Sequence, residues 1–202
     1  MPDLTTIHGH LLDPKLLPKV PIVLDFGATN ADFAIEFYQK YGGIIYCFEP
    51  DPTSAAEAWR RVREARLEKR IFLFREAIAD RAAAAARFYT FSGRKRVSSS
   101  LLYRGASQSI QVGLVTLVEV LKGFPRIDYL KMDIEGYEGL VLRACPKEEF
   151  RKIAQLSVEL HVELHAMNTP SLVAEGLTSY GYEARIAYQR SRNRPELYAR
   201  RR

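Results

Sequence analysis

The stretch that most constrains the fold is residues 127–142, where a short apolar run leads into a cluster of acids and then into a helix. Its first six residues have the composition of a buried strand. Asp133, Glu135 and Glu138 follow, and apolar residues then recur at helical spacing, which predicts a helix that ends before Pro146. Open α/β sheets place binding groups at the carboxyl ends of such strands. Acids also suit the first turn of a helix, but that alternative does not account for Asp133 at the strand tip.

Strand and helix patterns alternate along the rest of the chain, which predicts one three-layer α/β domain over residues 20–202 with a mostly parallel, seven-stranded sheet. We expect parallel strands at 20–25, 44–48, 71–74, 127–132 and 153–160, and a final antiparallel hairpin at 182–188 and 196–200. A small inserted β-pair is predicted at 87–91 and 110–114, with a polar loop at 98–100. Residues 1–19 hold three prolines and no sustained period, so we expect an irregular lead-in. Thr29 or Asn30 is the expected cap of the first helix.

The composition is that of a soluble protein, with 47% hydrophobic and 27% charged residues among 202. No apolar run approaches the ~18 residues of a membrane helix, and the first 20 residues do not resemble a secretory signal, so a cytoplasmic location without membrane contact is expected. The net charge of +6 is moderate. It favours a solvated basic face over attraction to nucleic acid or another anion.

The carboxyl ends of parallel strands meet at one edge of the sheet, and here that edge is predicted to be acidic. The turn at Gly27, followed about 20 residues later by Glu49 at the next strand's end, is the arrangement that binds ribose. A dinucleotide site would need further glycines where Thr29 and Asp32 stand, and Asp32 would repel phosphate. S-adenosylmethionine has a ribose and a positive sulfonium but no phosphate, so it fits better. The alternative is a plain tight turn and a surface acid.

Five motifs occur in an order that resembles the FkbM family of methyltransferases, and the likeness covers roughly residues 20–182. They are Asp25–Ala28 (DFGA), Phe48–Pro52 (FEPDP), Val97–Leu101 (VSSSL), Lys131–Glu138 (KMDIEGYE) and Val158–His161 (VELH). The resemblance implies a class I, Rossmann-like methyltransferase fold, S-adenosylmethionine as methyl donor, and usually O-methylation of a sugar or natural-product hydroxyl. Thr29 and Ala31 stand where the family usually has asparagine and a second glycine. We expect the Ala31 methyl group to crowd the methionine end of the cofactor.

The resemblance also implies roles for single residues. At the methionine moiety of the cofactor we expect Asp25, Gly27 and Ala28, with Thr29 in the same turn. Glu49 is expected at the ribose, and Pro50 and Ala77 near the adenine with Glu76 beside them. Asp133 is expected beside the transferred methyl group. Asp133 is the first candidate for the base that takes the acceptor's proton, and His161 is the second. A structural role for His161 is an equal alternative. Lys131 is a further catalytic candidate, with pairing to a carboxylate such as Glu159 as its alternative.

The acceptor predicted for such an enzyme is a small molecule or a glycan. Two alternatives stay open: a cofactor-binding or scaffold domain of the same fold that has lost catalysis, and an RNA-directed methyltransferase that uses the basic tail, although nucleic acid is not the expected partner. A divalent metal held by Asp133, Glu159 and His161 is a further variant. It is not expected, because no tight ligand spacing supports it.

Overall fold

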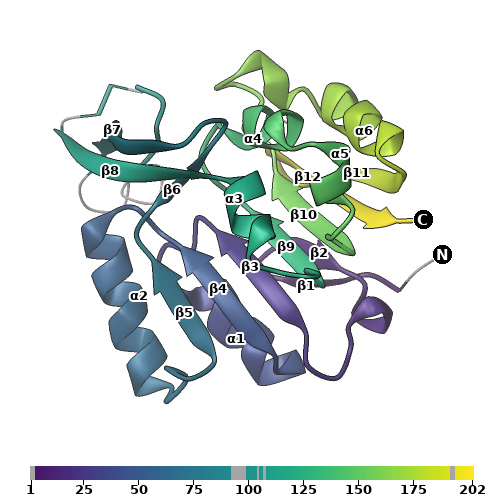
Figure 1. The fold of residues 1–202 in the computed structure, drawn as a ribbon, viewed down its shortest axis with the longest axis horizontal. Coiled ribbons are helices and arrows are strands. Elements are labelled where there is room, and N and C mark those ends of the chain that lie inside the picture. The colour runs from purple at the N-terminus through teal and green to yellow at the C-terminus, as the bar shows by residue number, and fades with distance from the viewer. Residues whose placement is uncertain (1–2, 92–98, 104, 107, 192–193) are drawn as a thin grey trace.

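The computed structural model describes residues 3–91, 99–103, 105–106, 108–191 and 194–202, and its centre is one seven-stranded sheet in the order β11-β12-β10-β9-β3-β4-β5 (Figure 1). The strands are β3 (Ile22–Phe26), β4 (Ile44–Phe48), β5 (Ile71–Phe74), β9 (Tyr129–Met132), β10 (Gln155–Glu159), β11 (Tyr182–Ser191) and β12 (Arg194–Arg201). The ladders from β10 through β9, β3 and β4 to β5 are parallel, whereas β12 is antiparallel to both β10 and β11. The predicted mostly parallel sheet with an antiparallel C-terminal hairpin is confirmed.

Helices cover both faces of this sheet, which gives the predicted three layers (Figure 1). They are α1 (Asp32–Tyr41), α2 (Pro52–Glu64), α3 (Leu117–Lys122), α4 (Glu138–Ala144), α5 (Lys147–Phe150) and α6 (Pro170–Ser179), with short 3-10 turns η1 (Pro14–Leu16) and η3 (Ala166–Asn168). One core packs α1 and α2 against the sheet through side chains such as Phe37 and Val62. The other packs α3 to α6 against it through side chains such as Leu121 and Leu177. Within the described ranges, no helix has the length and apolar character needed to span a bilayer.

The beginning of the chain is more ordered than its composition indicates. Strands β1 (Thr5–Ile7) and β2 (His10–Leu12) pair as an antiparallel hairpin, so the predicted irregular lead-in is wrong over these residues. The hairpin is docked by backbone donors: Leu11 N–H donates to Ser157 Oγ at 2.9 Å, and Asp13 N–H donates to Gln155 Oε1 at 2.9 Å. Strands of three residues are too short to show a period, and their docking depends on side chains far away in the sequence.

The insert is a small sheet of its own, beyond the carboxyl ends of β4 and β5 (Figure 1). The predicted pair is confirmed as β7 (Ala83–Thr90) and β8 (Gln108–Thr116), which run antiparallel and are longer than expected. A third strand, β6 (Ala77–Ala79), pairs in parallel with β8 and was not predicted. In the predicted loop, Ser98 lies outside the described residues, whereas Ser100 forms an isolated bridge with Tyr89.

Candidate functional site

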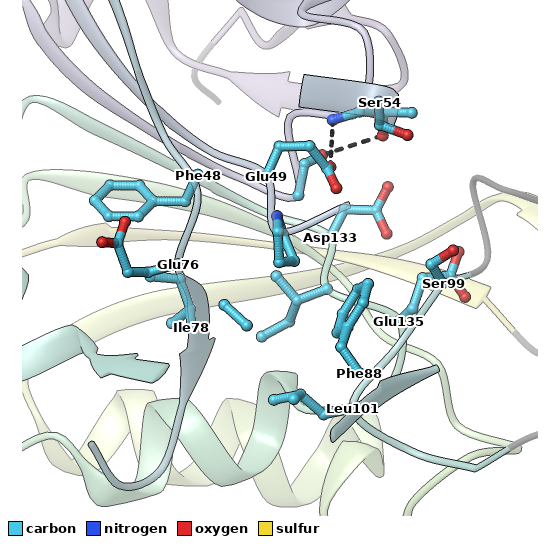
Figure 2. A pocket seen from close by; sticks show the side chains of 15 residues that line it. Phe48, Glu49, Ser54, Glu76, Ile78, Phe88, Ser99, Leu101, Asp133 and Glu135 are labelled. Carbon is cyan, nitrogen blue, oxygen red and sulfur yellow. Dashed lines mark hydrogen bonds between the residues drawn. The ribbon is translucent and has the colours of Figure 1, made fainter. Parts of the chain in front are cut away.

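A pocket opens at the carboxyl edge of the parallel strands, between that edge and the insert (Figure 2). It encloses about 520 Å³ when the space open to solvent is included. Seven of the residues predicted to bind a cofactor line it: Gly27, Thr29, Glu49, Pro50, Glu76, Ala77 and Asp133. Asp25 and Ala28 are buried and are not in the lining. The structure therefore gathers most of the predicted cofactor residues around one pocket.

Apolar side chains that sequence reasoning did not single out form the opposite wall. Phe88 lies in β7, Leu101 lies in the segment between β7 and β8, and Ile78 lies in the unpredicted strand β6. Figure 2 shows Phe88 and Leu101 facing a side of the pocket that carries Glu49 and Asp133. Leu101 belongs to the Val97–Leu101 motif, whereas no motif marks Phe88 or Ile78, since any strand of the insert would alternate apolar and polar residues in this way. The pocket is thus acidic on one side and apolar on the other.

The first turn brings the ends of β3 and β9 into close contact. Gly27 has φ +76°, and a Cβ atom at this position would lie 1.8 Å from the carbonyl oxygen of Asp133. Only glycine accepts both the dihedral angle and the contact. Its N–H and that of Ala28 donate to Phe48 O at 3.0 and 3.2 Å, which ties the turn to the end of β4. Gly27 thus sets the spacing between the strand tips that carry the acids.

The two departures from the family's first-turn motif fall on residues with left-handed backbone. Thr29 has φ 52° and Ala31 has φ 63°, and such angles favour asparagine or glycine. Ala31 is fully buried in the core, so the expected crowding of the cofactor by its methyl group is wrong. The expected cap by Thr29 or Asn30 is also wrong, because Ala31 is the N-cap and makes no side-chain cap. Both departures cost backbone strain, and the one at Ala31 takes no pocket space.

Glu49 is held at the tip of β4 by backbone donors. Its Oε2 accepts from Thr29 N–H at 2.8 Å, and its Oε1 accepts from Asp51 N–H at 2.9 Å. Burial raises the pKa of Glu49 to about 7, although these two hydrogen bonds act in the opposite direction. Each carboxylate oxygen has a further lone pair, so the group can also accept from the hydroxyls of a ligand.

Lys131 is a buried cation behind the first turn. Its Nζ lies 3.1 Å from Asp25 Oδ1 and donates to the carbonyl oxygens of Gly27 at 2.6 Å and Phe26 at 3.2 Å. Burial lowers the pKa of Lys131, but the carboxylates of Asp25 and Asp133 outweigh it and leave the pKa raised. The paired carboxylate is that of Asp25 rather than Glu159. Lys131 does not line the pocket, so its contacts support the shape of the first turn.

His161 lies at the centre of a buried polar network. Its Nδ1 lies 2.9 Å from Glu138 Oε1, and its Nε2 lies 3.3 Å from Glu135 Oε2. Burial lowers the pKa of His161, but its interactions with Glu135 and Glu138 outweigh burial and raise it to about 11. Asn168 Nδ2 donates to Glu138 Oε2 at 2.9 Å and to His161 O at 3.0 Å. A protonated imidazole does not accept a proton, so this geometry favours the structural alternative over a second base.

Asp133 connects this network to the pocket. Its side chain is 28% exposed and lines the pocket, and its Oδ1 lies 3.9 Å from His161 Nε2. Burial acts to raise the pKa of Asp133, but the charges of Lys131 and His161 leave it lowered. A carboxylate with a lowered pKa is a weak base at neutral pH. It suits attraction to a positive charge better than proton abstraction.

Among the residues that the structure describes, two sets of three have ligand atoms close enough to share a metal ion, with all atoms within 4.8 Å of one another. One is Asp133, Glu135 and His161, and the other is His10, Asp133 and Glu159. The predicted set of Asp133, Glu159 and His161 is neither of these two, although each of its members belongs to at least one of them. Glu135 could have been inferred from its position two residues after Asp133. His10 gives no sequence signal, because the β1–β2 hairpin that carries it was not expected.

The comparisons with known proteins agree with this geometry. The sequence profile described as "Methyltransferase FkbM domain" matches residues 25–184, and no curated protein matches the chain. The similar solved structures include three methyltransferases. An FkbM methyltransferase from Methylobacillus flagellatus has a TM-score of 0.59 and 15% identity, with 90% of this chain and 44% of that chain covered. A precorrin-6y C5,15-methyltransferase from Geobacter metallireducens has a TM-score of 0.55 and 13% identity, with 91% and 81% covered. TrmK of M. capricolum, in complex with S-adenosyl-homocysteine, has a TM-score of 0.54 and 15% identity, with 93% and 65% covered.

At these identities the structural similarities speak for the fold alone, and they confirm the predicted class I methyltransferase fold. The chain spans less than half the length of the Methylobacillus protein. The profile match is independent of those structures and covers more than half of the sequence. The chain therefore belongs to the FkbM family of methyltransferase domains.

Proposed function

We propose that this chain is an S-adenosylmethionine-dependent O-methyltransferase whose acceptor is a hydroxyl of a sugar or a natural-product-like small molecule. The observation that carries the proposal is that Glu49 and Asp133 line the same pocket, opposite apolar side chains such as Phe88 and Leu101. A nucleoside with a sulfonium group needs these surfaces: an acceptor for ribose hydroxyls, an apolar slot for a base and a negative charge for the sulfonium.

The residues present fit this cofactor. Glu49 would hold the ribose, since its oxygens keep lone pairs beyond those used by Thr29 and Asp51 N–H. Ala77, Ile78 and Phe88 would enclose the adenine, and burial of a ring against such side chains is favourable. Asp133 would lie at the sulfonium. Asp25 and Ala28 would act behind the lining, by fixing the first turn.

When bound, the cofactor would supply the methyl group and would keep the electron pair of the broken carbon–sulfur bond, while the acceptor oxygen would form the new bond to carbon and its proton would pass to water. The main contribution of this chain would be to hold the acceptor oxygen in line with the methyl group. Positioning of this kind can lower an activation barrier by about 7 kcal/mol or more. Asp133 would contribute charge, because its pKa is lowered by Lys131 and His161 after the opposing effect of burial. The apolar wall would exclude water from the reacting groups.

Calorimetric titration in excess chelator tests the cofactor assignment. The chain should bind S-adenosylhomocysteine, and Glu49→Gln should weaken binding about tenfold or more, or ~1.4 kcal/mol. Asp133→Asn should weaken S-adenosylmethionine more than S-adenosylhomocysteine, since only the former carries the positive charge. Glu64→Gln, with its carboxylate 60% exposed on α2, is the matched control. Absence of binding by the intact chain would refute the proposal.

Methyl transfer from a labelled donor to a panel of hydroxyl compounds separates the enzyme from the scaffold alternative. Label appearing on a hydroxyl compound, and its loss in Glu49→Gln, supports the proposed activity. Binding without transfer supports a scaffold domain. Label appearing in RNA instead would move the acceptor to nucleic acid.

A further inference from the structure

Three ligand atoms converge at the inner end of the pocket. One ligand atom from each of Asp133, Glu135 and His161 lies within 4.8 Å of the other two. His161 Nε2 is 3.3 Å from Glu135 Oε2 and 3.9 Å from Asp133 Oδ1. Atoms that share a metal ion at ~2.1 Å each lie about 3 Å apart, so these separations need little adjustment. Asp133 and Glu135 also line the pocket, so an ion between these atoms would face a bound ligand.

Two of these atoms are buried without a hydrogen bond. His161 Nε2 and Asp133 Oδ1 have no hydrogen-bond partner among the described residues, and the His161 ring is fully buried. Glu135 Oε2 lies 3.3 Å from Nε2, which is near enough for an ion pair. Leaving a buried polar atom unsatisfied costs ~1–3 kcal/mol, and it calls for an explanation when two such atoms face each other.

The surroundings of His161 have the layout of a supported metal ligand. Its Nδ1 is engaged by Glu138 Oε1 at 2.9 Å, which directs Nε2 toward the pocket. Glu138 is itself fixed by the backbone N–H groups of Ile134 at 3.1 Å and Gly136 at 3.0 Å, and by the Asn168 amide. A carboxylate behind a histidine is the usual way in which a metal-binding imidazole is oriented. Here that carboxylate is fully buried and held by several donors.

We propose that Asp133, Glu135 and His161 bind a divalent cation at the inner end of the pocket. The two carboxylate oxygens suit Mg²⁺ or Mn²⁺. The imidazole nitrogen also suits other divalent ions of the first transition row. The ion would take the place of the proton on Nε2 and would join the two unsatisfied atoms. Arg194 Nη1 lies 3.9 Å from Glu135 Oε1, on the carboxylate oxygen that is not needed for the ion.

The role of this ion in methyl transfer rests on the proposed function, whereas the binding of the ion does not. An acceptor hydroxyl that coordinates the ion beside the cofactor would become more acidic. Its proton would pass to water, its oxygen would bond to the methyl carbon, and the electron pair of the carbon–sulfur bond would stay on sulfur. The ion would therefore supply the activation of the acceptor hydroxyl.

Titration of the metal-free chain with Mn²⁺ alone, followed by electron paramagnetic resonance, tests the site. One Mn²⁺ should bind, and spin-echo modulation of the bound ion should show coupling to one imidazole nitrogen. Asp133→Asn and His161→Gln should each weaken Mn²⁺ binding more than about tenfold. His8→Gln, whose imidazole is 42% exposed, is the control for a surface histidine and should leave the affinity unchanged.

His10→Gln separates the two sets of ligand atoms that share Asp133. Unchanged Mn²⁺ affinity in His10→Gln supports the proposal, and loss of binding there but not in His161→Gln would overturn it in favour of the neighbouring set. Absence of Mn²⁺ binding by the unsubstituted chain, or a bound ion without nitrogen coupling, would overturn it as well. These two measurements do not depend on whether a variant folds. S-adenosylhomocysteine titration of the metal-free chain is read separately, so failure of the metal site and failure of the proposed function give different results.

Discussion

Replacement of Glu49 by glutamine should change how the stability of the protein depends on pH. Burial raises the pKa of Glu49 from 4.5 to about 7 in the folded chain. The folded state therefore holds this proton more tightly than the unfolded state does. The resulting stabilisation is fully present below pH 4.5 and is lost as the pH rises through 7. At ~1.4 kcal/mol for each pH unit, the gap between 4.5 and 7 amounts to about 3 kcal/mol.

Urea unfolding of both proteins between pH 4.5 and 8 measures this effect. The free energy of unfolding of the wild type, minus that of Glu49→Gln, should fall by about 3 kcal/mol across the range. Glutamine keeps one oxygen for the two N–H donors of Thr29 and Asp51, which adds an offset that does not vary with pH. Glu64→Gln controls for the loss of one negative charge at an exposed position. Parallel profiles for wild type and Glu49→Gln would refute the assignment of a buried, proton-holding carboxyl group.

Three further predictions follow from the same contacts. Binding of S-adenosylhomocysteine should weaken about tenfold for each pH unit below 7, because the ribose needs the ionised Glu49 carboxylate, and calorimetry of Glu49→Gln should lack this dependence. Ala31→Gly should raise the free energy of urea unfolding by about 1 kcal/mol because it relieves a left-handed alanine, whereas Ala34→Gly, inside α1, should lower it. Lys131→Met should lower the free energy of urea unfolding by ~3–5 kcal/mol, because it leaves Asp25 buried without its cation. The double variant Lys131→Met/Asp25→Asn should lose less than Lys131→Met alone, and an equal loss in both would contradict this cause.

Much of the fold and of the pocket could be predicted from local pattern alone. The run 44–48 is uniformly apolar, as a strand covered on both faces must be, and it forms β4 with these bounds. Because parallel strands end at one edge, the acids that follow them were expected to meet, and Glu49, Glu76 and Asp133 do line one pocket. These inferences need only the spacing of apolar residues along the sequence and the right-handedness of crossover connections between parallel strands.

The parts that were not predicted depend on contacts between distant residues. The β1–β2 hairpin is held by Ser157 and Gln155, and His10 reaches the metal-ligand cluster only because that hairpin docks. The direction of the Ala31 methyl group follows from a left-handed backbone angle, which the family motif does not give. Lys131 pairs with Asp25 because the register of β3 and β9 sets these two residues opposite each other. No local pattern contains that information.

The two ends of the chain meet behind the pocket, and this has a consequence for biosynthesis. His10 Nδ1 lies 2.9 Å from Glu196 Oε1, a contact across 186 positions, and β12 lies between β11 and β10 in the sheet. While the polypeptide is still leaving the ribosome, β2 and β10 therefore lack the partner that completes their packing. The acidic edge can therefore reach its final geometry only after residues 194–201 have been synthesised, so this domain cannot complete its sheet while β12 is still missing.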